Sequence, residues 1–236
     1  MRLIKPQNNK RLAMLVYGEA GNGKTSLVRS IPKDEGICIL SGESGELSIL
    51  DVLERQNVDC YEISNFDDMR EAYKTLKTNK EFIEKYKWVF IDSLTEIAER
   101  CLEAMREKYP SDQQTYKLWG AYGDGMKGLI KSFRDLTEYS VVFTCLVEVE
   151  QDDFKRRFVR PAIQGKQLKD RLTSYFDEVF YLSVESDEQK TKRLFYTQPG
   201  DSPRGIVEAK DRSGKLSPIV EPAHIGNVMK KIFGGK

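Results

Sequence analysis

The sequence predicts an α/β protein with a mainly parallel central sheet, helices on its faces and an antiparallel C-terminal extension. Short continuous apolar runs, typical of strands buried on both faces, alternate with amphipathic stretches over much of the chain. A glycine-rich loop joins the first apolar run to a helix-like stretch. In the last third, short strand-like runs separated by turn residues indicate antiparallel pairing at a sheet edge, at 179–184, 193–197 and 206–209.

The individual elements follow from the period of the apolar residues. We expect strands of the parallel sheet at 12–17, 37–40, 58–63, 88–91 and 141–146. Helices are expected at 26–31, 48–55 and 67–77, and from 94 until Pro110, where apolar residues recur at helical spacing. The polar, glycine-containing segment 111–125 is expected to be a loop before or within a helix that continues to about Glu138. Since no long linker or repeat interrupts this order, we predict a single domain over 1–236.

Residues 18–25 read Gly-Glu-Ala-Gly-Asn-Gly-Lys-Thr, the G-x-x-x-x-G-K-T pattern of a phosphate-binding loop. Glycines let such a loop curl tightly, so that successive backbone N–H groups face the β- and γ-phosphates. Lys24 is expected to contact the phosphates and Thr25 to give its hydroxyl to Mg²⁺. The following helix would aim its positive end at the triphosphate. We therefore predict binding of ATP and Mg²⁺ by Gly18, Glu19, Ala20, Gly21, Asn22, Gly23, Lys24, Thr25 and Ser26.

Asp92 ends an apolar run and is predicted to hold Mg²⁺ or its water shell. An alternative is that Asp92 or Ser93 caps the next helix, and both roles are compatible. Because Ser93 follows where a second carboxylate could activate water, the catalytic base must come from elsewhere. Glu43, in the segment after the strand at 37–40, is the best candidate, and Glu46 is its rival.

Near the C-terminus, Lys210 and Arg212 are two residues apart and project to one side if the chain is extended. Taken alone, the segment 209–215 is a charged turn.

Together these features resemble the RecA-like P-loop ATPases, and most closely the core-only phage proteins of the Sak-type single-strand annealing group. The closer resemblance lies in Gln164-Gly165-Lys166, in 175–179 and in 209–216. It implies that Glu43 polarises the attacking water and that Lys210 and Arg212 enter the site of a neighbouring subunit. It also implies a ring or filament of this chain, single-stranded DNA as partner, and a role in phage recombination. A single-strand-binding protein is a further candidate partner.

Two features depart from the RecA-like pattern. The strand at 141–146 ends in Thr-Cys-Leu and lacks the polar sensor, often Gln, of the recombinases. About ten residues precede the first strand, with no separate oligomerisation domain among them.

A basic segment at 154–160 is the candidate DNA contact. Cations that neutralise phosphates alternate there with aromatics that stack on bases, in the set Phe154, Lys155, Arg156, Arg157, Phe158 and Arg160. The alternative is a solvated β-hairpin with both phenylalanines packed inward. A second segment, 116–122, offers aromatics and one cation.

Composition limits the remaining possibilities. The chain has 236 residues, a net charge of +1, four dispersed cysteines and one histidine, which gives little support for a disulfide framework, a zinc site or a histidine-based nucleophile. No apolar run approaches the ~20 residues of a membrane span, so we expect a cytoplasmic protein, in the host cytoplasm if phage-encoded. Alternatives to DNA annealing are a helicase-like motor, a small-molecule kinase and a nucleotide-gated regulator.

Overall fold

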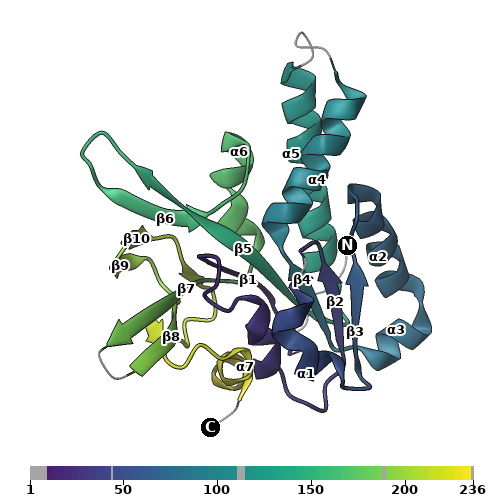
Figure 1. Ribbon diagram of the computed structural model, residues 1–236, viewed down its shortest axis with the longest axis horizontal. Helices are drawn as coiled ribbons and strands as arrows, with labels where there is room; N and C mark the ends of the chain where they lie inside the picture. The colour runs from purple at the N-terminus through teal and green to yellow at the C-terminus, as the bar shows by residue number, and fades with distance from the viewer. Residues whose placement is uncertain (1–9, 44, 111–114, 188–189, 235–236) are drawn as a thin grey trace, which may run out of the picture.

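The computed structural model describes residues 10–43, 45–110, 115–187 and 190–234 (Figure 1). Its sheet contains parallel strands in the order β3-β2-β4-β5-β1-β7, and β8 and β12 continue it in antiparallel pairing. The parallel strands are β1 (Ala13–Gly18), β2 (Ile37–Ser41), β3 (Val58–Glu62), β4 (Trp88–Asp92), β5 (Ser140–Gln151) and β7 (Glu178–Asp187). The predicted α/β fold with a mainly parallel sheet and antiparallel C-terminal strands is confirmed.

Helices cover both faces of this sheet. One face packs against α2 (Phe66–Thr78), α4 (Leu94–Lys108) and α5 (Thr115–Arg134). The other packs against the 3-10 helix η1 (Thr25–Ser30), α1 (Leu50–Leu53) and α7 (Ile225–Phe233). Within the described ranges, no helix is both long and apolar enough to cross a membrane. The remaining short helices are η2 (Glu46–Ile49), α3 (Lys80–Lys85), α6 (Lys166–Lys169) and η4 (Leu172–Tyr175).

Short strands complete the C-terminal third. β8 (Lys190–Tyr196) pairs with β7, and β12 (Ile219–Val220) pairs with β8. β11 (Lys210–Asp211) pairs with the first two residues of β7, Glu178 and Val179. β6 (Arg157–Pro161) pairs in antiparallel orientation with the C-terminal part of β5. β10 (Gly205–Val207) pairs with β6, and β9 (Gly200–Ser202) pairs with β10. The β5–β6 hairpin and the α4–α5 pair project from the same side of the molecule (Figure 1).

Three predicted elements differ from the structure. The loop expected at 111–125 is wrong for its described part, because α5 is helical from Thr115 and ends at Arg134. Burial of its apolar face, including Tyr122 and Met126, outweighs the low helix propensity of its four glycines. Residues 111–114 lie outside the described part of the chain. The strand at 141–146 runs on to Gln151, and the helix after the phosphate loop is a six-residue 3-10 helix.

Glu178, at the start of β7, gives the fold a pH-sensitive contact. Its side chain is fully buried, and burial together with the nearby Asp211 carboxylate raises its pKa to about 8. In the unfolded chain the pKa returns to its ordinary value of 4.5. The unfolded chain therefore loses the Glu178 proton first, and the free energy of unfolding falls between pH 4.5 and 8 by up to about 1.4 kcal/mol per pH unit.

Glu178→Gln removes the titration, so we expect the variant to lose most of this pH dependence and to exceed the wild-type stability at pH 8. Urea unfolding at pH 5, 6.5 and 8 measures the effect. The exposed Glu62→Gln serves as a control and should keep the wild-type slope. An unchanged slope in Glu178→Gln would contradict the assignment.

Candidate nucleotide site

The phosphate loop begins where β1 ends, at Gly18. Gly21 and Gly23 have φ values of +79° and +89°, a region that side chains rarely adopt, so glycine is required at both positions. Gly18 is required for space, because a Cβ there would lie 2.7 Å from the carbonyl oxygen of Leu182. The three glycines thus allow both the curl of the loop and its close approach to β7.

Lys24 lies inside the loop rather than in solvent. Its side chain is only 7% exposed, and Nζ donates hydrogen bonds to the carbonyl oxygens of Gly18 at 3.0 Å and Glu19 at 2.9 Å. Burial lowers the pKa of Lys24, while the carboxylates of Glu43 and Asp92 oppose this shift. The ammonium group is therefore held at the place where the motif predicts phosphate contact.

Asp92 is brought beside Thr25, as the prediction of a Mg²⁺ site requires. Asp92 is 2% exposed, and its Oδ2 accepts a hydrogen bond of 2.6 Å from Thr25 Oγ1. Its Oδ1 accepts from Thr144 Oγ1, and burial raises the pKa of its carboxyl group. Ser93 caps α4 by accepting from the Glu96 amide, so capping does not need Asp92.

A hydroxyl and a carboxylate oxygen in contact are the hard oxygen donors that Mg²⁺ prefers. The residues present therefore fit the ion: Thr25 and Asp92 would hold it, and it would offset charge on the phosphates. Neither residue needs a large displacement to face a common ligand, because their oxygen atoms already meet.

Glu43 lies on the same edge of the sheet. The amide of Gly42 donates to the Asp92 carbonyl oxygen at 2.7 Å, and the carbonyl oxygen of Glu43 accepts from Ser41 Oγ at 2.6 Å. The Glu43 carboxylate opposes the lowering of the Lys24 pKa by burial and adds to the raised pKa of Asp92. The rival, Glu46, begins η2 directly after Gly45, where an added Cβ would lie 3.6 Å from Thr25 Oγ1. The assignment of Glu43 as the base, with Glu46 as its rival, stays a prediction.

Lys210 and Arg212 lie at the opposite end of β1 from the phosphate loop. Lys210 pairs with Val179 in the β11–β7 ladder, and Val179 is level with Leu15, near the start of β1. Lys210 Nζ donates to the carbonyl oxygens of Thr173 and Phe176, at 3.3 and 2.6 Å. Lys210 is thus turned inward and does not project beside Arg212.

Arg212 is more accessible than Lys210. It forms an ion pair of 2.6 Å with Asp177, and its side chain is 54% exposed. Because it lies at the end of β1 opposite the phosphate loop, Arg212 cannot contact a nucleotide bound in its own subunit. The predicted role of Lys210 and Arg212 in a neighbouring site stays a prediction, and only Arg212 has its cation at the surface.

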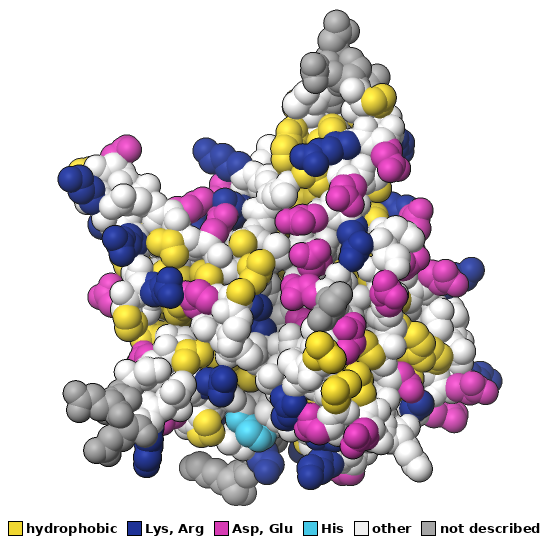
Figure 2. Space-filling model, viewed as in Figure 1, with side chains coloured by type: hydrophobic (Ala, Val, Ile, Leu, Met, Phe, Trp, Pro, Cys, Tyr) yellow, Lys and Arg dark blue, Asp and Glu magenta, His cyan; other side chains and the backbone are white. Residues whose placement is uncertain are grey.

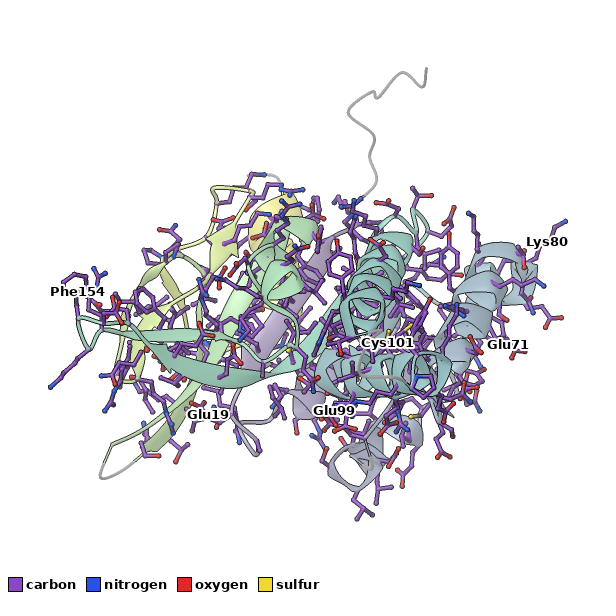
Figure 3. All side chains as sticks on the ribbon, turned by 90° about the horizontal axis from the view of Figure 1, so that it is seen from above. Glu19, Glu71, Lys80, Glu99, Cys101 and Phe154 are labelled. Atoms are coloured by element: carbon purple, nitrogen blue, oxygen red, sulfur yellow. The ribbon has the colours of Figure 1, made fainter. Side chains whose placement is uncertain are left out.

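The β5–β6 hairpin brings the predicted DNA-contact residues together but neutralises some of them. Phe154, at the hairpin tip, is 80% exposed and projects away from the body of the protein (Figure 3). Arg156 pairs with Asp152 at 2.7 Å and lies over the rings of Phe154 and half-buried Phe158.

The four basic residues therefore differ in the charge they can offer. Arg160 has three carboxylates within ion-pair distance, and Arg156 has one. Among the residues that the structure describes, Lys155 and Arg157 form no ion pair. A DNA contact through this hairpin would rest mainly on Lys155, Arg157 and the exposed Phe154.

Side chains from the C-terminal third of the chain also contact the phosphate loop, and the sequence did not predict them. Glu19 accepts hydrogen bonds from Tyr181 Oη at 3.0 Å and Asn22 Nδ2 at 2.7 Å, and pairs with Arg204 at 2.9 Å. Asn22 also donates to the Leu182 carbonyl oxygen. No sequence motif identifies these partners, because they come from distant parts of the chain: Tyr181 and Leu182 from β7, which runs parallel to β1, and Arg204 from the turn between β9 and β10.

A protein family and a distant solved structure are similar to this chain. A KaiC-like protein from the archaeon Pyrococcus horikoshii OT3 is 13% identical, with 83% of this chain and 88% of that chain covered at a TM-score of 0.42. No curated protein matches the chain. A family model described as an AAA domain matches residues 10–213, which include the loop, Glu43, Asp92 and the C-terminal cations. The chain therefore belongs to the AAA domain family and is a P-loop ATPase.

Proposed function

We propose that this ATPase binds single-stranded DNA and uses ATP to promote strand annealing or exchange in phage recombination, as the Sak-type resemblance implies. The observation that carries the proposal is a groove of about 650 Å³ between α5 and the segment 165–175. Four aromatic residues line it: Tyr116, Trp119, Tyr122 and Tyr175. Three cations accompany them, Lys127, Lys166 and Arg171, together with Asp124, which forms an ion pair of 3.7 Å with Lys127.

The chemistry of this groove suits a single strand. Tyr116 is 90% exposed and Trp119 is 41% exposed, so both rings present faces on which unpaired bases can stack. Trp119 is held edge-on against Tyr122, with ring centroids 5.7 Å apart. In the described residues Lys166 and Arg171 form no ion pair, which leaves their charge for phosphates.

The negative charge of the α4 face favours the groove, rather than that face, as the DNA site. Acidic side chains gather on the face of α4 seen in Figure 2, which would repel a nucleic acid strand. Glu99 of α4 lies on the same side of the molecule as Glu19 of the phosphate loop (Figure 3). The groove of aromatic and basic residues, lined by α5, offers the opposite chemistry.

A chain of hydrogen bonds runs from the nucleotide site toward the groove. Thr144 of β5 donates to Asp92, and two residues further on the Leu146 amide donates to Thr95 Oγ1 at 3.0 Å. Thr95 Oγ1 also donates to the Ala162 carbonyl oxygen at 3.2 Å, just before the segment that lines the groove. These contacts support a coupling between occupancy of the nucleotide site and the position of the DNA-binding segment.

Groove variants test the proposal through binding of a fluorescent oligonucleotide. Trp119→Ala should weaken binding by about 5- to 150-fold, because one stacked base contributes about 1–3 kcal/mol. Lys166→Ala with Arg171→Ala should reduce the slope of log affinity against log salt by about 0.7 for each lost phosphate contact.

Tyr61→Ala is the matched control, since Tyr61 is exposed to 40% on β3, away from the groove residues. It should bind DNA as the wild type does. Wild-type affinity and salt slope in all groove variants would refute the groove as the DNA site. A Lys155→Ala, Arg157→Ala hairpin variant measured in parallel shows whether the hairpin adds a second contact.

A further inference from the structure

We propose that Arg193 is a nucleotide-binding residue that contacts the phosphates of a triphosphate held in its own subunit's loop. The inference rests on the proposed ATP-binding role of the loop and adds a cation that the glycine-rich motif does not contain. Arg193 Nε donates to the Asn22 carbonyl oxygen at 3.1 Å. A Cβ added to Gly23 would also lie 3.1 Å from this nitrogen. The guanidinium therefore lies directly against the second half of the phosphate loop.

The backbone of Arg193 is fixed beside the loop by strand pairing. Arg193 is opposite Val184 in the β7–β8 ladder, and its carbonyl oxygen accepts from the Ala223 amide at 2.8 Å. β7 runs parallel to β1 with Tyr181 level with Tyr17, so Val184 lies beyond the end of β1, beside the phosphate loop. The approach of Arg193 to the loop thus follows from the sheet and does not depend on a mobile segment.

The charge of Arg193 is available to an anion, unlike that of its neighbour. Two arginines contact the loop from the C-terminal strands, and Arg204 is neutralised by Glu19 at 2.9 Å. No described carboxylate forms an ion pair with Arg193. Because Nε is the atom bound to Asn22, the two terminal NH₂ groups remain, and these bind phosphate oxygens in a bidentate geometry.

Such a cation would add to the positive potential of the loop. The helix that follows it is a 3-10 helix of six residues, whose short run of peptide dipoles provides less positive potential than a long α-helix. Of the motif's own side chains, Lys24 is the cation, and its Nζ is bound to carbonyl oxygens of the loop. A fixed arginine on the adjacent strand supplies the additional positive charge in cis.

Three substitutions separate a phosphate contact from a merely structural one. Calorimetric titration with MgATP and MgADP measures the affinity of Arg193→Ala, Arg193→Gln and Arg193→Lys. We expect about 10- to 150-fold weaker binding in the Ala and Gln variants, the scale of a lost hydrogen bond to a charged group. The Lys variant keeps the charge and should bind more tightly than the Gln variant.

The neighbouring residue provides the matched control. Lys192 lies next to Arg193 on β8 and forms an ion pair of 3.4 Å with Glu221, so Lys192→Ala should bind MgATP as the wild type does. If Arg193 only holds the loop through Asn22, the Gln and Lys variants, which both keep an N–H donor, should bind equally well. Equal affinities for these two variants, or wild-type affinity in Arg193→Ala, would overturn the inference.

The same titrations distinguish the inference from the function on which it rests. A wild-type chain that does not bind MgATP rejects the proposed function itself. Wild-type binding that Lys24→Met abolishes and Arg193→Ala leaves unchanged rejects only the role of Arg193. Urea midpoints of the Arg193 variants equal to that of Lys192→Ala, together with weakened binding, support the phosphate contact.

Discussion

Lys24→Ala is expected to lose measurable ATP turnover and most of its ATP affinity. The substitution removes a cation that the loop holds with two carbonyl oxygens, at 3.0 and 2.9 Å, where the phosphates are predicted to lie. We expect turnover to fall at least about a hundredfold, the scale for removing one preorganised group that stabilises developing charge. Calorimetric titration with MgATP and a phosphate-release assay measure the two effects.

Two further variants show whether this loss comes from chemistry or from unfolding. Lys24→Met keeps the length of the buried side chain while removing its charge, and it should be as inactive as the Ala variant with a smaller change in stability. Lys33→Ala, an exposed lysine after η1, should retain full turnover. Wild-type turnover in Lys24→Met would show that the loop is not the site of hydrolysis.

Arg212→Ala is expected to bind ATP normally and to lose turnover by about 10³–10⁵-fold, the range for removing an arginine finger. Its cation lies at the end of β1 opposite to the loop and is 54% exposed. It can therefore act only on the site of another subunit. Phosphate release at saturating ATP, with affinity measured separately, tests both parts of this expectation.

Mixing experiments test the shared site directly. A mixture of Arg212→Ala and Lys24→Ala chains contains interfaces at which the first chain supplies an intact loop and the second supplies Arg212. Partial recovery of turnover is expected in the mixture and in neither variant alone. A mixture as inactive as its components would argue against a site shared between subunits.

Local sequence was sufficient to predict the parts of the site that follow one strand directly. Thr25 Oγ1 and Asp92 Oδ2 lie 2.6 Å apart because the carboxyl ends of parallel strands share one edge of the sheet. The phosphate-loop motif identifies Thr25 directly. Glu43 follows β2 at the same edge, and its role as the base stays a prediction. Arg193, Arg204 and Tyr181 were not, because their approach to the loop depends on the register of strands more than 150 residues away.

The positive charge that the hairpin can offer to DNA could not be predicted from the local sequence either. The run 154–160 contains four cations, but Arg156 and Arg160 are paired with carboxylates brought to them by the hairpin turn and by cross-strand neighbours. The glycines of the segment 115–125 favour a loop locally, but burial of the apolar stripe of α5 makes the segment helical. The groove depends on this helix, because Tyr116, Trp119 and Tyr122 share one face of α5.

The most direct test of the central claim is ATP hydrolysis by the wild-type chain alone and with single-stranded DNA, duplex DNA or RNA, at low and moderate salt. The account predicts turnover that single-stranded DNA stimulates most strongly and that rising salt reduces. Turnover unaffected by every nucleic acid would contradict it, and would leave a small-molecule kinase or a nucleotide-gated partner of another protein as the better description of this ATPase.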